Sequence, residues 1–402
     1  MAGAGLQPAA PRHRRLRRRR RGHPHRPGHP GVHGRVIGRK HLLYLALEAP
    51  REGQASYAHI HEICGGLRRR GWTVDLFAPS YSGAWKRPGL ARRMLEYLCL
   101  QWRLMRAFED GQVVYVRSHF LAFPASFWAR LRGAPIIHEI NGPYEDVAIA
   151  YAWARPLAGV IKWMWRRQFR WAGRLITVTP QLADWVRAQG VTTPVDVVPN
   201  GANTELFHPH ADCGLDLPER YAVFFGGLAR WQGIPTLLAA RRSPAWPQGV
   251  DLVIVGDGPE RPAVAAAAAG DPGIVDLGRQ PYRVLPGIVA RSLCGLVPKN
   301  NLGDRTGTGL FPLKVFETLA CGVPAIVTDF PGQADLVRDN DCGLAVPAED
   351  PDALARAVAE LASDPARAAE MGRRGRDAVV AAHSWDIRAG ETEAALQRLT
   401  AA

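Results

Sequence analysis

The sequence predicts an α/β protein made of two doubly wound, Rossmann-like domains that face each other across a cleft. Short apolar segments alternate with helical segments in two separate runs, which is typical of parallel sheets covered by helices. The alternation breaks once, at 199–218, where three prolines and two glycines indicate a linker. A chain of 402 residues is also too long for a single hydrophobic core.

Residues 1–40 hold almost all of the net positive charge. They contain eleven Arg, one Lys and no acidic residue, whereas residues 41–402 hold 39 basic and 37 acidic side chains. The net charge of +14 therefore says little about the partners of the folded part, and nucleic acid is an unfavoured partner. With almost no apolar residues this Arg-rich head cannot form a core, so we expect it to be disordered. Whether the head belongs to the natural protein is left open.

The first half of the chain predicts strand and helix units in regular order. Residues 41–47 (HLLYLAL) are an apolar strand, and the loop at 48–56 leads into a helix at 57–70 that Gly71 ends. The other strands expected are 72–78, 113–117, 135–141, 175–179 and 195–198, and the other helices are 90–108, 122–132, 156–172 and 181–189.

The same alternation restarts after the linker. Segments follow at 221–225, 234–241, 250–255, 274–277, 284–290 and 295–297, and the closing helices are 351–361, 365–382 and 385–399. No apolar run of about eighteen residues occurs, so we expect no membrane span. Six scattered cysteines without paired spacing argue against a disulfide framework or a zinc site and favour a reducing, cytoplasmic location.

The stretch TGTGLFPLKVFETLACGVPAIVTD (306–329) is the strongest local signal. Its Gly/Thr loop runs into a short helix, for which Pro312 suits the first turn and Gly322 the end. A loop that feeds a helix N-terminus offers free N–H groups and the positive end of the dipole, which suits a phosphate. Lys314 and Glu317 share one face of this helix. On the residues alone, an exposed ion pair is the favoured interpretation of these two.

Several segments resemble a known family, and they occur in that family's order. They are RGWTVDLFAP (70–79), VVPNGANTELFHP (197–209), FFGGLARWQGIPTLL (224–238), IVGDGPERP (254–262) and PLKVFETLACGVPAIVTD (312–329). With them the chain resembles, over about 41–400, the retaining nucleotide-sugar glycosyltransferases of the GT-B fold, of the family 4 (group 1) type. The resemblance implies a metal-independent hexosyltransferase (EC 2.4) that needs no cofactor and uses a nucleoside-diphosphate sugar as co-substrate.

The same resemblance implies a division of labour along the chain. Residues 41–205 would bind the acceptor, residues 206–382 would bind the nucleotide sugar, and a helix at 383–402 would cross back to the first domain. The acceptor would be a glycan, a lipid-linked sugar or a small molecule, as in cell-envelope or polysaccharide biosynthesis.

On the donor side, the resemblance assigns Glu317 to the ribose hydroxyls and Lys314 to the diphosphate. An ionised carboxylate suits a vicinal diol because it accepts two hydrogen bonds and donates none. Gly309 stands where the family usually has a second Glu that touches the donor sugar, which leaves the sugar contacts open. The residues expected to meet the phosphates and the sugar are Thr308, Gly309, Leu310 and Phe311.

The phosphate loop GGLARWQG departs from the family pattern. Gly227 and Gln232 occupy the positions where the family has Arg and Lys. We predict that Arg230 substitutes as the phosphate-binding, catalytic cation, because Arg suits bidentate phosphate contact; a solvent-exposed loop Arg is the equal alternative. Lys299 and Arg305 are further candidate cations. The turn expected against the base is Gly256, Asp257 and Gly258, with a plain tight turn as the alternative.

On the acceptor side, the strand that ends in HEIN carries the candidate catalytic groups. Aligned with the family, the active-site His falls on Asn141, and strand alternation puts Glu139 on the same face and His138 on the other. We predict Asn141 first and Glu139 second as site residues, and a structural role for His138. Glu139 is also the one candidate nucleophile for a double displacement, although same-face attack, with the departing phosphate taking the acceptor proton, is the favoured route. Gly53 and Gln54 would approach the donor phosphate and the acceptor, and Arg117 is a weaker acceptor-side candidate.

Other interpretations stay open. The basic and aromatic stretches at 85–106 and 161–171 are either amphipathic core helices with solvated Arg faces or a docking surface for an anionic membrane. The replacements at Gly309 and Gln232 motivate a second hypothesis, a catalytically impaired relative that binds nucleotide sugar or supports a partner enzyme. A sugar-nucleotide epimerase lacks a convincing acid–base set, and a P-loop NTPase is excluded because GTGLFPLK does not match GxxxxGK[ST].

Overall fold

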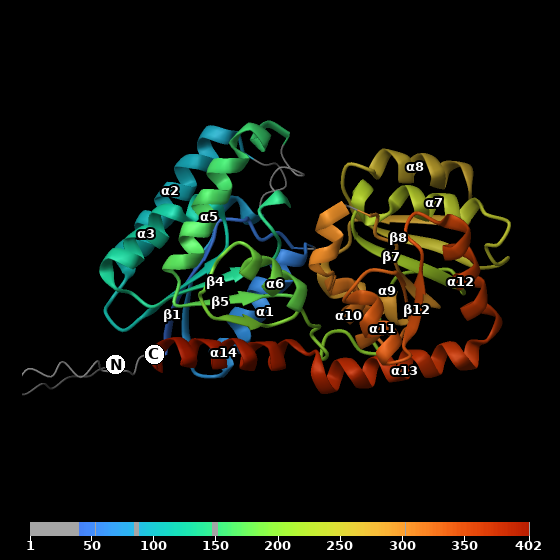
Figure 1. The fold of residues 1–402 in the computed structure, drawn as a ribbon. Helices are drawn as coiled ribbons and strands as arrows, with labels where there is room; N and C mark the ends of the chain where they lie inside the picture. The colour runs from blue at the N-terminus through green and yellow to red at the C-terminus, as the bar shows by residue number, and fades with distance from the viewer. Residues whose placement is uncertain (1–39, 53, 84–87, 147–151, 302, 402) are drawn as a thin grey trace, which may run out of the picture. The chain divides into compact units, whose positions relative to one another are not determined.

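The computed structural model describes residues 40–401 apart from 53, 84–87, 147–151 and 302, and they belong to one compact unit, Ile37–Ala402. The predicted disordered head at 1–40 lies outside the described residues, Lys40 excepted. Two six-stranded parallel sheets, each flanked by helices, make up the described chain (Figure 1). The predicted fold class, two doubly wound α/β domains, is confirmed.

The first sheet has the strand order β2-β1-β3-β4-β5-β6. Strand β1 is buried along nearly its whole length because helices cover both faces of the sheet, which explains its continuous apolar run. The strands are β1 (His41–Ala46), β2 (Thr73–Phe77), β3 (Val113–Arg117), β4 (Ile136–Ile140), β5 (Arg174–Thr177) and β6 (Val195–Val197). The helices are α1 (Ala55–Arg69), α2 (Leu90–Ala107), α3 (Phe123–Arg132), α5 (Ala158–Trp171) and α6 (Pro180–Ala188).

The second sheet has the strand order β12-β11-β10-β7-β8-β9. Its strands are β7 (Tyr221–Gly227), β8 (Asp251–Asp257), β9 (Ile274–Gly278), β10 (Cys294–Val297), β11 (Ala325–Thr328) and β12 (Gly343–Val346). Its helices are α7 (Ile234–Arg242), α8 (Arg261–Gly270), α9 (Leu285–Ala290), α10 (Leu313–Ala320), α11 (Gln333–Asp339), α12 (Pro351–Ser363) and α13 (Pro365–Ala382).

Three elements of the second half were not predicted. Helix α8 (RPAVAAAAAG) is apolar all round, so it has no amphipathic stripe to detect. Helix α11 and strand β12 are short and are defined mainly by pairing and packing, since β12 forms the sheet edge beside β11. The local sequence pattern predicts such elements least well, because their stability comes from long-range contacts.

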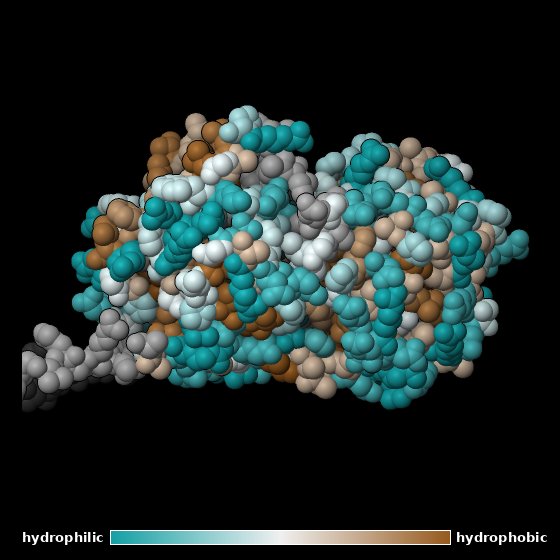
Figure 2. Space-filling model, in the orientation of Figure 1, coloured by the Kyte–Doolittle hydropathy of each residue, from teal (hydrophilic) through white to brown (hydrophobic). Residues whose placement is uncertain are grey.

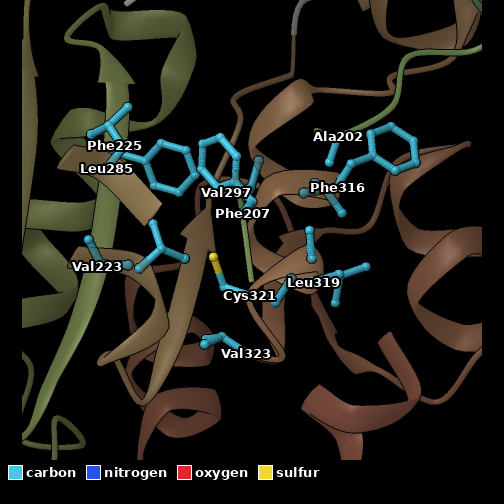
Figure 3. Close-up of a cluster of buried hydrophobic side chains, with 14 of the residues drawn as sticks. Ala202, Phe207, Val223, Phe225, Leu285, Val297, Phe316, Leu319, Cys321 and Val323 are labelled. Atoms are coloured by element: carbon cyan, nitrogen blue, oxygen red, sulfur yellow. The ribbon is translucent and has the colours of Figure 1, made fainter. Parts of the chain in front are cut away.

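Helix α10 packs on the core of the second domain through one face. Figure 3 shows Phe316, Leu319 and Cys321 of this region among Phe207, Phe225 and other buried side chains. The helix crosses β10 so closely that a Cβ on Gly295 would lie 2.5 Å from the Thr318 side chain. This packing fixes the rotation of α10 and hence the direction of its polar residues.

The last helix, α14 (Trp385–Ala401), packs against α1 in the first domain (Figure 1). Polar contacts hold it there, because Glu393 accepts hydrogen bonds from the Trp72 indole at 3.0 Å and from Lys40 at 2.8 Å. Trp385, the first residue of α14, is one of the largest fully buried side chains. The C-terminal segment therefore joins helices of the first sheet after α13.

Helix α2 buries only part of its apolar side chains. Leu98 and Trp102 are each 56% exposed, whereas Tyr97, Leu100 and Leu104 are buried. Apolar side chains of α2 therefore face outward beside several arginines.

Within the described part of the chain no helix has the length and apolarity needed to cross a membrane. The six cysteines are all unpaired, and four of them are buried.

Candidate functional site

The strand order of the second sheet reverses between β7 and β10. In open α/β sheets, ligands bind beyond the carboxyl ends of the strands at this switch point. Strand β7 ends in Gly226-Gly227, and Gly226 has a positive φ of 124°. A Cβ on Gly226 would lie 3.3 Å from the Lys314 Nζ, so the head of this lysine reaches the end of β7. The topology and α10 together bring a cation to the favoured binding position.

Lys314 is a buried basic residue that Gln232 anchors. Its side chain is 8% exposed, its Nζ donates to Gln232 Oε1 at 3.2 Å, and it lies 4.0 Å above the centre of the Phe224 ring. Burial, together with the like charge of Lys299, holds the pKa of Lys314 well below its ordinary value, although Glu317 opposes this. An anion beside Nζ would relieve that penalty.

Glu317 lies one helical turn further on and is 5% exposed. Its Oε1 accepts a hydrogen bond from the Tyr282 hydroxyl at 2.7 Å. Burial raises the pKa of Glu317 to about 7, although the Tyr282 hydrogen bond and the charge of Lys314 oppose the shift. A carboxylate in this state gains from a ligand that donates to its second oxygen.

The interpretation of Lys314 and Glu317 as an exposed ion pair is therefore wrong. Both side chains are buried, and each has another partner, Gln232 for the lysine and Tyr282 for the glutamate. Tyr282 was not predicted as a site residue, because it lies in a short turn before α9 without any recognisable motif.

The loop before α10 is only partly free to bind a phosphate with its N–H groups. The N–H of Leu310 donates to Pro331 O at 2.9 Å, so the expectation of a free N–H at Leu310 is wrong. The Thr308 carbonyl accepts from the Thr179 hydroxyl at 2.7 Å, and the Phe311 carbonyl accepts from Asn200 Nδ2 at 2.8 Å. The first turn of α10, including Lys314, retains N–H groups that have no intrahelical acceptor.

Gly309 is required by its surroundings. Its φ is +77°, and a Cβ would lie 2.6 Å from the side-chain oxygen of Gln181 in α6. That oxygen is buried and has no hydrogen-bond partner. The place where the family usually has a carboxylate is thus occupied by an amide from the first domain.

Gly227, the last residue of β7, and Arg230, which follows the strand, are both exposed. Arg230 starts a short 3-10 turn (Arg230–Gln232) that also holds Gln232, the partner of Lys314. Lys299 is half-buried, and the side chain of Arg305 lies outside the described residues. The structure therefore places Arg230 as an exposed side chain in the turn that follows β7 at the switch point.

The turn Gly256-Asp257-Gly258 at the end of β8 has a packing reason for both glycines. A Cβ would lie 1.9 Å from Gly226 O at the first and 2.3 Å from Leu228 O at the second. Asp257 is exposed, and its Oδ1 accepts from the Gly258 N–H at 2.8 Å. The turn is tight because two backbone strands approach each other there, beside the Lys314 region.

The first sheet has its own switch point, between β1 and β3, and a cavity of about 460 Å³ lies there. Residues that follow β1, β3 and β4 line it, which places the predicted Gln54 and Asn141 in one wall. Gly53 lies outside the described residues. The charged and polar lining includes Glu48, Arg51, Gln54, Arg93, Arg117, Asn141 and Asp146.

Glu139 lies behind this cavity and is surrounded by hydrogen-bond donors. Tyr44, Tyr115, Arg117, Asn141 and His59 all approach its carboxylate, at 3.1, 2.6, 2.5, 2.6 and 3.0 Å. Burial by itself would raise the pKa of Glu139, but His59 and Arg117 hold it below its ordinary value. Glu139 is 1% exposed, so as a nucleophile it would have to leave these partners. The geometry contradicts the nucleophile interpretation and makes Glu139 the anchor of Asn141.

His138 points to the other face of β4, as strand alternation predicts. Its Nε2 lies 3.2 Å from the Ser126 hydroxyl, and burial lowers its pKa to about 3. It is 0% exposed and lines no part of the cavity described above. The side chain is a neutral core group.

Two models of known families match the chain. "Glycosyltransferase Family 4" matches residues 58–206, and "Glycosyl transferases group 1" matches residues 219–364. Among solved structures, sucrose-phosphate synthase from Thermosynechococcus elongatus has a TM-score of 0.72 at 20% identity and covers 90% of this chain and 100% of its own. HepE of Anabaena, solved with UDP-glucose, has a TM-score of 0.64 at 14% identity, over 89% and 99% of the two chains. The fold is GT-B.

Curated relatives agree with this class. A GDP-mannose-dependent alpha-(1-6)-phosphatidylinositol monomannoside mannosyltransferase of Mycobacterium tuberculosis is 32% identical over 51% of this chain and 56% of its own length. A D-inositol 3-phosphate glycosyltransferase of Gordonia bronchialis is 27% identical over 71% and 66%. The chain spans about half the length of the first curated relatives that it matches. The two family matches together cover most of the chain, and it belongs to the group 1, family 4 glycosyltransferases of the GT-B fold.

Proposed function

We propose that this protein transfers a hexose from a nucleoside-diphosphate sugar to a hydroxyl acceptor with retention of configuration and without a metal ion. The observation that carries the proposal is the buried pair Lys314 and Glu317 at the switch point of the second sheet. Each has a pKa moved toward its neutral form by burial, so both gain from a ligand that offers a diphosphate to one and a diol to the other. A nucleoside diphosphate has both groups at a suitable spacing.

The relatives support a hexose donor. Two of the relatives described above are a GDP-mannose-dependent mannosyltransferase and an inositol-phosphate glycosyltransferase, and a structural neighbour was solved with UDP-glucose. We therefore take GDP-mannose and UDP-glucose as the first donors to test.

The acceptor would enter the cavity at the first switch point. Asn141 donates its Nδ2 to Glu139, which leaves its Oδ1 to accept a hydrogen bond from an acceptor hydroxyl. Because Glu139 is enclosed by donors, the attack would occur on the face of the departing diphosphate, whose oxygen takes the acceptor proton. The new glycosidic bond forms as the sugar–phosphate bond breaks. Lys314 and the first turn of α10 would stabilise the charge on the leaving diphosphate.

Release of nucleoside diphosphate from a panel of sugar nucleotides is the test. We expect turnover with at least one hexose donor, unchanged by EDTA, and a product whose anomeric configuration by NMR equals that of the donor. Inversion of configuration would contradict the retaining mechanism. Loss of activity on chelation, restored by a divalent ion, would contradict metal independence. Tight binding of sugar nucleotides with no turnover for any acceptor would instead favour the second hypothesis, a catalytically impaired relative. The replacements at Gly309 and Gln232 are the reason for considering that hypothesis.

The outer face of the first domain suggests where the acceptor resides. Figure 2 shows apolar surface among hydrophilic residues over the region of α2 and α5. The Arg106 guanidinium lies 4.7 Å above the Trp102 ring, and Trp102 and Trp163 are about half exposed. The exposed large apolar side chains of this face are Leu90, Leu95, Leu98, Trp102, Phe127, Leu131, Leu157, Val160 and Trp163. We propose that this face docks on an anionic membrane and presents a lipid-linked acceptor.

Sedimentation with vesicles tests the docking. We expect binding to phosphatidylglycerol-containing vesicles, weak binding to pure phosphatidylcholine, and release by salt. The double variant Arg103→Glu, Arg106→Glu should lose roughly tenfold or more in binding, since each basic residue near the surface contributes about 1 kcal/mol. Arg242→Glu, an exposed arginine of α7, is the control. Equal sedimentation with both lipids, or equal losses in both variants, would end the proposal.

A further inference from the structure

A continuous line of hydrogen bonds joins the loop before α10 to the cavity of the first sheet. The Phe311 carbonyl accepts from Asn200 Nδ2 at 2.8 Å, and Asn200 Oδ1 lies 2.9 Å from His59 Nδ1. The other ring nitrogen, His59 Nε2, lies 3.0 Å from Glu139 Oε1, which also accepts from Asn141 at 2.6 Å. The line therefore runs from the segment that leads to Lys314 to a residue in the wall of the cavity.

The partners determine the direction of each bond. A backbone carbonyl only accepts, so Asn200 must turn its amide nitrogen to Phe311 and its oxygen to His59. An ionised carboxylate also only accepts, so Glu139 requires a donor from His59. Both nitrogens of His59 therefore face oxygen atoms, Asn200 Oδ1 on one side and Glu139 Oε1 on the other.

His59 lies in a buried polar cluster of the first domain. His59 is 4% exposed, and the buried charges near it are Glu139 and Arg117, whose guanidinium also reaches the exposed Glu48 carboxylate at 3.3 Å. The edge of the Trp385 ring closes the remaining side of the imidazole, with ring centres 5.2 Å apart.

We infer that His59 is a positioning residue that holds the donor loop in register with the acceptor cavity. Through Asn200 it ties the backbone at Phe311, one residue before Pro312 and α10, and through Glu139 it orients the Asn141 amide. No substrate contact is assigned to it. The inference rests on the proposed function, because only a transfer between two ligands makes the relative position of loop and cavity matter for the reaction.

Two substitutions separate this role from a general loss of folding. Asn200→Asp keeps an oxygen for His59 but has no N–H for the Phe311 carbonyl, so it cuts the line at the loop. His59→Gln cannot donate to both partners, because its amide has a donor at one end only. The control is His61→Gln, an exposed histidine on the same helix whose Nδ1 faces only the Tyr57 carbonyl.

The first measurement needs no activity. We expect amide hydrogen exchange of residues 308–314 to be about tenfold faster in Asn200→Asp and His59→Gln than in the wild type and His61→Gln, which is the size of one lost hydrogen bond. Thermal unfolding of each variant confirms the fold. Unchanged exchange of this segment in folded variants would overturn the inference, whatever the protein catalyses.

The second measurement tests whether the hydrogen bonds couple the donor loop to the acceptor cavity during transfer. With the donor and acceptor found for the wild type, transfer should fall at least about tenfold in both variants, while hydrolysis of the donor by water and binding of free nucleoside diphosphate stay within a few-fold. A purely structural role would lower transfer and hydrolysis together, which would also overturn the inference. If the wild-type protein binds no nucleoside diphosphate, the proposed function is refuted. The hydrogen-exchange measurement would then still test whether the hydrogen bonds of His59 and Asn200 hold the loop.

Discussion

Lys314→Met is expected to lower the rate of nucleoside-diphosphate release by about 100-fold or more, because it removes the buried cation that would face the leaving diphosphate. Methionine has a similar length and fills the space below Phe224 without a charge. The unliganded variant should be as stable as the wild type or more stable, because burial disfavours the charged lysine. The measurements are steady-state kinetics, calorimetric titration with the nucleoside diphosphate, and thermal unfolding.

Lys299→Met is the matched control for this prediction. Lys299 is half-buried and near enough to lower the pKa of Lys314, so its removal takes a like charge away from the site. We expect a loss of transfer well below that of Lys314→Met. If Lys314→Met keeps its activity within threefold, or if the two variants lose equally, the assignment of Lys314 to the diphosphate is wrong.

Glu317→Gln is expected to stabilise the unliganded protein at alkaline pH and to weaken nucleotide binding. The pKa of Glu317 is about 7 in the folded protein against 4.5 in the unfolded chain. Because the folded pKa is raised, the stability linked to proton binding is complete below about pH 4.5 and is lost as the pH rises through 7. The glutamine variant has no such loss, so at pH 8 its free energy of unfolding should exceed that of the wild type by up to about 3 kcal/mol.

Nucleotide affinity should change in the opposite direction. The ribose diol needs the ionised carboxylate as acceptor, so wild-type affinity should fall as the pH drops below about 7. Glu317→Gln should bind roughly 10- to 100-fold more weakly at pH 8 and with little dependence on this range of pH. The control is Glu205→Gln, an exposed position in the linker. Equal unfolding curves for wild type and Glu317→Gln at both pH 5 and pH 8 would contradict the burial argument.

Much of the fold could be predicted from local pattern. The strand at 113–117 and the helix at 365–382 have the predicted bounds, and most other elements differ by one or two residues at an end. Helix α8, helix α11 and strand β12 could not be found in this way, because an alanine-rich helix has no polar face and a short edge strand has little sequence of its own.

Of the candidate site, sequence reasoning placed Lys314, Glu317 and Asn141 at binding positions but could not give their surroundings. Tyr282 and His59 were missed, since neither lies in a motif and each acts through a partner far away in the chain. His59 meets Asn200 across 141 residues, and Tyr282 meets Glu317 across 35. Only packing brings such pairs together.

The sequence by itself determined the two α/β halves, the linker between them and the helix that presents Lys314 and Glu317, because periodicity, glycine and proline act over a few residues. The tertiary structure decided whether those side chains are exposed or buried, and burial is what moves their pKa values and gives each of them a partner other than the opposite charge. It also decided that Glu139 is an enclosed anchor and Asn141 the group at the cavity wall. Burial is set by which distant segments pack together, and that information does not reside in any one stretch of the chain.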